Sequence, residues 1–154
     1  MNQRINYAKA SPGGLKAMLA LQGHVDACGL DHQLLELVKM RASQINGCAY
    51  CLDMHSKDAR AAGETEQRLY LLDAWREAPF YSPLERAALA WTEALTRIAG
   101  NEVSDALYDE ARQHFSEKQL VDLSLAIIAI NGWNRLAIPF RSEPGHYQPR
   151  GHGK

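Results

Sequence analysis

Apolar residues recur at helical spacing along most of this chain, and residues that start or stop a helix separate these stretches. Typical N-caps precede them at Asp31, Thr65, Ser82, Ser104 and Ser116. Ser82 and Glu85 have the spacing of a capping box, and Pro83 stands at the first helical position. No alternation of apolar and polar residues is long enough to indicate a strand. The sequence therefore predicts an all-α fold.

Six or seven helices are expected from these signals. They run over about 14–28, after Asp31 as far as the turn at Asn46-Gly47, over 48–62, after Thr65, over 83–100, over 105–115, and after Ser116. The last helix is apolar nearly all round between Leu123 and Ile130, so we expect it deep in the fold or in a subunit contact. Asn131-Gly132 is expected to break or bend it.

Composition narrows the functional classes. The 154 residues suit one domain, and a net charge of −1 gives no electrostatic case for binding nucleic acid. The N-terminal segment lacks the apolar region of a signal peptide, and the apolar run 126–130 is too short to span a membrane. We therefore expect a cytoplasmic protein without membrane association. Residues 1–142 are expected to form the helical domain, and 143–154 a polar, extended or mobile arm rich in Pro and Gly.

Two of the three cysteines stand close together, as Cys48-Ala-Tyr-Cys51, with His55 four residues later. Three cysteines are too few, and odd in number, for a secreted disulfide framework. On a helix with Cys48 in the first turn, offsets of three and seven residues return to within about 60° of the start, so Cys48, Cys51 and His55 share a face. The helix N-terminus favours the thiolate of Cys48.

A cysteine pair on one helical turn can cycle between dithiol and disulfide. Glu36, at the edge of an apolar stripe in the preceding helix, is expected to have its pKa raised by burial, which suits a proton acceptor near neutral pH. Two other interpretations stay open: a zinc site formed by the two thiols with His55 and Glu36, and inert core cysteines. The spacing of the thiols and the histidine favours redox chemistry.

The pattern Glu36, eleven residues, Cys48-x-x-Cys51-x-x-x-His55 resembles the active-site signature of the AhpD-like alkylhydroperoxidases. These belong to the carboxymuconolactone decarboxylase superfamily. The similarity is strongest over about 34–60, and the segment Asn131-Gly-Trp-Asn-Arg-Leu136 resembles the family's last helix.

The resemblance implies an all-α homo-oligomer, a trimer or a hexamer, with peroxide-reducing or disulfide-reducing activity. In such proteins the second cysteine, here Cys51, is attacked by the peroxide, and the first, here Cys48, resolves the sulfenic acid to a disulfide. The residues matching Glu36 and His55 form the proton relay. An external dithiol or protein reductant then regenerates the thiols, and no metal, flavin or nicotinamide is expected in the chain.

One position departs from the pattern. Some members carry His just before the second cysteine, where this chain has Tyr50, and a phenol with a pKa of about 10 is a poor base at pH 7. The relay is therefore expected to consist of Glu36 and His55 alone. Trp133, Asn134 and Arg135 are expected near a subunit contact.

Two alternative functions remain at this stage. One is a non-redox enzyme of the decarboxylase branch, with Glu36 or His55 as acid–base and the thiols as bystanders. The other is a redox sensor or disulfide reductase whose thiols switch without turnover of peroxide.

Overall fold

The computed structural model describes residues 2–100 and 102–149, and these residues form eight α-helices and one short 3-10 helix, with no strand among them. The helices are α1 (Tyr7–Ala10), α2 (Pro12–Ala27), α3 (His32–Asn46), α4 (Ala49–Ala61), α5 (Glu66–Leu71), η1 (Leu72–Ala74), α6 (Pro83–Thr96), α7 (Asp105–His114) and α8 (Glu117–Phe140). The expected all-α, single-domain fold is confirmed. The additional helix is α1, which buries no residue and starts at a side-chain cap by Asn6.

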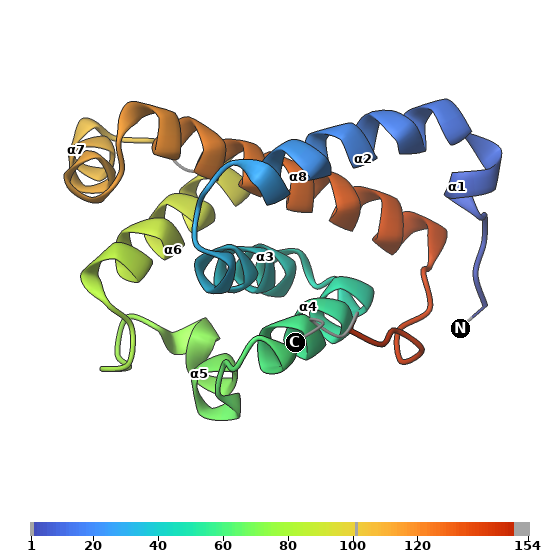
Figure 1. Cartoon of the computed structure of the whole chain (residues 1–154), viewed down its shortest axis with the longest axis horizontal. Helices are drawn as coiled ribbons and strands as arrows, with labels where there is room; N and C mark the ends of the chain where they lie inside the picture. Colours follow the sequence, from blue (N-terminus) through green and yellow to red (C-terminus); the bar gives the residue numbers. More distant parts are fainter. Residues whose placement is uncertain (1, 101, 150–154) are drawn as a thin grey trace.

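Helix α3 is the centre of the molecule. Every residue from 34 to 43 is buried, because α3 packs against α4, α6 and α8 on different sides. Figure 1 shows α3 between α6 and α4, with α2 and α8 crossing over it. Asp31 starts the helix by accepting a hydrogen bond from the Leu34 N–H, as its sequence predicts. Because α3 is buried on all sides over these residues, the surrounding helices hold its side chains in place.

Helix α8 is the longest element and contacts α2, α3, α4, α6 and α7. By length and hydropathy alone it passes the test for a membrane-spanning helix, as the core helix of a globular bundle also does. The expected break at Asn131-Gly132 is wrong. The helix runs on through both residues because Asn131 bonds back to the Ile127 carbonyl and Gly132 lets Met18 approach closely.

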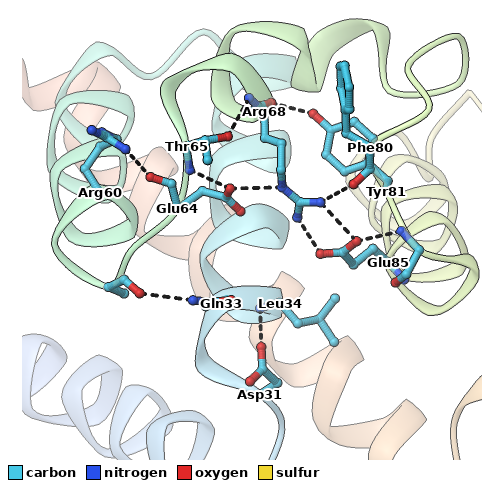
Figure 2. A network of polar contacts seen from close by, with 12 residues as sticks. Asp31, Gln33, Leu34, Arg60, Glu64, Thr65, Arg68, Phe80, Tyr81 and Glu85 are labelled. Carbon is cyan, nitrogen blue, oxygen red and sulfur yellow. Dashed lines mark hydrogen bonds and ion pairs between the residues drawn. The ribbon is translucent and has the colours of Figure 1, made fainter.

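The predicted N-caps at Thr65, Ser82, Ser104 and Ser116 are all present, and Ser82 and Ser116 form complete capping boxes. Figure 2 shows how the start of α6 is tied to α5. Arg68 places its Nε 2.9 Å from Glu64 and an Nη 2.5 Å from Glu85, the capping-box residue of α6. This ion-pair network holds two helices that lie away from the cysteines, and it is structural.

The C-terminal segment from 143 to 149 lies along α4. Asp53 accepts a hydrogen bond from the Gly145 N–H at 2.9 Å, and the Tyr147 hydroxyl donates to Asp58 at 2.7 Å. Lys57 donates to the carbonyls of Gly145 and Tyr147. The expected arm is thus extended and held by α4 over these residues, while 150–154 lie outside the described part of the chain.

Candidate functional site

The cysteine pair lies at the turn from α3 to α4. Gly47 adopts a left-handed conformation with φ of 67°, which ends α3 and reverses the chain at little cost because glycine has no Cβ. Cys48 is then the N-cap of α4, one position earlier than the first-turn placement expected from the sequence, and Cys51 lies in the first turn. Both are free thiols and each is 1% exposed.

The two thiols shift each other's pKa in opposite directions. The hydrogen bond that Cys51 donates to Cys48, opposed by burial and assisted by the amides of Cys51 and Tyr50, lowers the pKa of Cys48 to about 7. The same hydrogen bond, together with burial, raises the pKa of Cys51. The Cys48 side chain makes no capping hydrogen bond to the backbone of α4. Its place at the N-terminus of this helix still favours the thiolate. The dithiol therefore loses its first proton near neutral pH and leaves the charge on Cys48.

Glu36 and His55 form a second buried pair. Nδ1 of His55 lies 2.9 Å from Oε2 of Glu36, and Nζ of Lys39 lies 2.8 Å from Oε1. Burial acts to raise the pKa of Glu36, but the hydrogen bond and charge of His55 and the charge of Lys39 outweigh it and lower the pKa to about 2. The raised pKa expected from the sequence is wrong, because two cationic or donor groups contact the carboxylate. Glu36 is therefore ionised and orients His55.

A cavity of about 510 Å³ lies between the Glu36–His55 pair and Cys51. Glu36, His55 and Cys51 line it, and Cys48 does not. Its remaining wall includes Lys39 and is rich in aromatic and sulfur-bearing side chains, namely Tyr7, Tyr50, Met54, Trp133 and Tyr147. Glu36, Cys51 and His55 thus face one cavity. Cys48, the fourth predicted site residue, lies beside Cys51 at the start of α4.

The second cavity, of about 730 Å³, lies on the Cys48 side. Gly47, Cys48 and Ala49 line it from the α3–α4 turn, and the end of α8 with residues 141–146 completes it. Only Tyr50 and Ala137 line both cavities. Cys51 therefore lines the first cavity and Cys48 the second.

The residues that could bind a metal ion in the structure differ from those of the zinc site that the sequence left open. Within the described residues, ligand atoms of Glu36, His55 and Asp58 lie within 4.8 Å of one another, and neither thiol belongs to this group. The Lys39 ammonium, bonded to Glu36, opposes a cation there. These residues do not fit the thiolate-based zinc centre.

Sequence reasoning missed two residues of the site. Lys39 stands three residues after Glu36, a spacing that places both side chains on one face of α3 and could have been noticed. Asn134 is fully buried, donates to Ser43 at 3.1 Å and acts to lower the pKa of each cysteine. The sequence places Asn134 in a segment that resembles the family's last helix, but its proximity to the dithiol arises only in the folded chain.

The other residues singled out have different surroundings. Trp133 lines the first cavity and donates to Gln22, and Arg135 is exposed and bonds to Asn131 in its own helix. Cys28 is half-buried at the end of α2 and lines neither cavity.

Comparison with known proteins identifies the family. The sequence profile of the carboxymuconolactone decarboxylase family matches residues 12–94, which run from the start of α2 into α6 and include all four predicted site residues. The chain belongs to the carboxymuconolactone decarboxylase family. The uncharacterized protein YdfG of Bacillus subtilis (strain 168) is 48% identical over 138 residues, which cover 90% of this chain and 94% of that protein.

Solved structures place the chain among the AhpD-like members of this family. The protein of unknown function ATU0492 from Agrobacterium tumefaciens, for which an AhpD role in antioxidant defence has been suggested, superposes with a TM-score of 0.91 at 47% identity. That match covers 95% of this chain and 100% of the other. The debrominase Bmp8 superposes with a TM-score of 0.80 at 22% identity, covering 90% of this chain and 74% of the other, and it shares the fold.

Proposed function

We propose that this protein is a thiol-dependent peroxidase that reduces organic hydroperoxides through the Cys48–Cys51 dithiol. One observation carries the proposal: Cys51 lines the same cavity as the Glu36–His55 pair and at the same time donates a hydrogen bond to the Cys48 sulfur. A nucleophile, a proton-transfer group and a resolving thiolate therefore lie within one small region.

The oxidative half-reaction begins at Cys51. Its thiol gives up its proton to His55, directly or through solvent, as the sulfur attacks the peroxide O–O bond. That bond breaks, the sulfur becomes a sulfenic acid, and the departing alkoxide takes the proton back from His55 to leave as an alcohol. Glu36 holds Nδ1 of His55 throughout, so Nε2 is the nitrogen that exchanges the proton.

The resolving step uses the charge already present on Cys48. Its thiolate attacks the sulfenic sulfur of Cys51, the S–O bond breaks, and the released hydroxide takes a proton to become water. The product is a Cys48–Cys51 disulfide, which an external dithiol reduces with oxidation of its own thiols. The Cys51 thiol, which is the main cause of the low pKa of Cys48 in the dithiol, has been consumed by this step, and the place of Cys48 at the N-terminus of α4 continues to favour its thiolate.

The similarity to ATU0492, for which an AhpD role in antioxidant defence has been suggested, supports redox chemistry of this class without naming a substrate, since ATU0492 and YdfG are uncharacterized. Charged and polar side chains line the cavity together with Tyr7, Tyr50 and Trp133, and it is this aromatic part of the wall that supports an organic hydroperoxide over hydrogen peroxide alone.

The test is consumption of cumene hydroperoxide with dithiothreitol as the electron donor. We expect steady turnover by the wild-type protein and none by the double variant Cys48→Ser/Cys51→Ser. A wild-type protein that consumes no hydroperoxide, while the double variant keeps turnover of a lactone or keto acid, would instead establish the decarboxylase branch. A disulfide that forms once and changes the assembly without turnover would establish a sensor.

A further inference from the structure

The two cysteines line different cavities. Cys51 lines the first cavity with Glu36 and His55, whereas Cys48 lines the second. Tyr50, which stands between the cysteines in the sequence, and Ala137 from α8 line both cavities. The two cysteines nevertheless lie within one turn at the start of α4, and each shifts the pKa of the other.

Given the proposed peroxidase function, we propose that oxidant and reductant use separate entrances: the hydroperoxide reaches Cys51 through the first cavity, and a low-molecular-weight dithiol reaches Cys48 through the second. The second cavity is thus the reductant site.

Burial decides the class of reductant. Cys48 is only 1% exposed, so any reductant thiol reaches its sulfur only when neighbouring groups move, and a slender small dithiol requires a smaller displacement than a folded protein does. The cavity of about 730 Å³ does admit a slender small molecule. Arg141 and Glu143, of opposite charge, both line it, so it does not reject a neutral dithiol.

The chemistry balances with a dithiol. One reductant thiolate attacks the Cys48 sulfur, the Cys48–Cys51 bond breaks, and Cys51 leaves as a thiolate that takes up a proton. The second reductant thiol then attacks the reductant sulfur of the mixed disulfide, which releases Cys48 as a thiolate and the reductant as its own disulfide. Two electrons pass from the dithiol to the protein.

Cys51 is able to leave in this reaction. Its raised pKa in the dithiol arises first from the hydrogen bond to the Cys48 sulfur, with burial and the Cys48 charge adding to it. While Cys48 is held in the mixed disulfide it carries no charge, so two of these causes are absent when Cys51 departs.

The test measures the two half-reactions separately in variants that fill one cavity each. Ile138 is 45% exposed and Glu143 is exposed, and both line the second cavity alone, so Ile138→Trp and Glu143→Trp narrow that entrance. Met54 lines the first cavity alone, and Met54→Trp is the matched control. Size-exclusion chromatography and circular dichroism verify that each variant keeps the wild-type assembly and helix content.

Oxidation is followed by counting thiols after rapid mixing with cumene hydroperoxide, and reduction by mixing the disulfide form with dithiothreitol. We expect Ile138→Trp and Glu143→Trp to slow reduction by about tenfold or more and to leave oxidation within about twofold, and Met54→Trp to do the reverse. If both half-reactions slow together in each variant, the proposal of separate entrances is wrong. If thioredoxin reduces the wild-type disulfide faster than dithiothreitol does, the proposal of a low-molecular-weight reductant is wrong.

The disulfide for the reduction experiment is made with diamide, which needs no peroxidase activity. A wild-type protein that cumene hydroperoxide does not oxidise would therefore overturn the proposed function, while the reduction rates of the diamide-treated variants would still decide the reductant entrance.

Discussion

Nδ1 of His55 and a carboxylate oxygen of Glu36 lie 2.9 Å apart in the core, on α4 and α3 respectively. The other oxygen of Glu36 is held by Lys39 at 2.8 Å. The carboxylate is therefore fixed from two sides and in turn fixes the imidazole ring. This bridge explains why Glu36 acts as an orienting anion rather than as the raised-pKa base expected from its sequence context.

Replacing Glu36 by Gln is expected to slow Cys51 oxidation by about 10- to 100-fold, because the neutral amide no longer orients His55 or stabilises its positive charge. The pH profile of the oxidation rate should shift as well. Glu64→Gln is the matched control, since Glu64 is a buried carboxylate that pairs with Arg68 away from the cavities. Wild-type rates in Glu36→Gln at every pH would exclude the relay.

The low pKa of Glu36 also predicts acid sensitivity. The folded-state pKa of about 2 lies below the ordinary value of 4.5, so its contribution to stability is fully present above about pH 4.5 and is lost as the pH falls toward 2. The difference corresponds to roughly 3 kcal/mol. Urea unfolding across this range should show a steeper loss of unfolding free energy in the wild type than in Glu36→Gln, and parallel curves would contradict the ion-paired state.

The hydrogen bond from Cys51 makes the acidity of Cys48 depend on Cys51. In a Cys28→Ser background, ultraviolet absorbance of the thiolate should titrate with a pKa of about 7 for Cys48. Cys51→Ala removes the hydrogen bond that is the largest cause of this low pKa, so the titration should move to higher pH. An unchanged midpoint would mean that the helix N-terminus alone sets the acidity.

The two cysteines are expected to differ in their roles. Cys51→Ser should reduce hydroperoxide consumption to background, because the cavity then holds no nucleophilic sulfur. Cys48→Ser should still form a sulfenic acid at Cys51, which a dimedone adduct reveals by mass spectrometry, but should not turn over. Full turnover by Cys48→Ser would reverse the assignment.

Helix α8 carries exposed apolar side chains that suit a subunit contact. Val121 and Ile128, seven residues apart on one face, are 59% and 54% exposed. We expect a trimer or hexamer in solution that Ile128→Glu dissociates, measured by light scattering. Ile98→Glu, which alters an equally exposed residue after α6, is the control. A wild-type monomer would contradict this expectation.

Local signals in the sequence account for most of the fold. Asp31, Ser82 and Ser116 start the expected helices because N-cap hydrogen bonds depend only on neighbouring residues. Most of the apolar centre of α8 is buried as its composition predicts, with Ile128 exposed. The helix does not break at Asn131-Gly132, where Asn131 bonds back to the Ile127 carbonyl and Met18, from a distant part of the chain, packs against the glycine.

The candidate site was predictable only in part. The spacing of Cys48, Cys51 and His55 follows from one helix, and the helix places them as expected within one residue. The pKa of Glu36 depends on Lys39 and His55 approaching from two helices, and the cysteines line two cavities that share Tyr50 and Ala137. Such relationships arise from tertiary packing and have no local signature.

Cys48 and Cys51 are expected to form a disulfide when one equivalent of organic hydroperoxide reacts with the native protein. Thiol titration before and after this addition, with mass spectrometry of the peptide that carries both cysteines, measures this reaction. We expect the loss of two thiols and a Cys48–Cys51 disulfide, with Cys28 still reduced. Retention of all three thiols, or oxidation confined to Cys28, would contradict this prediction.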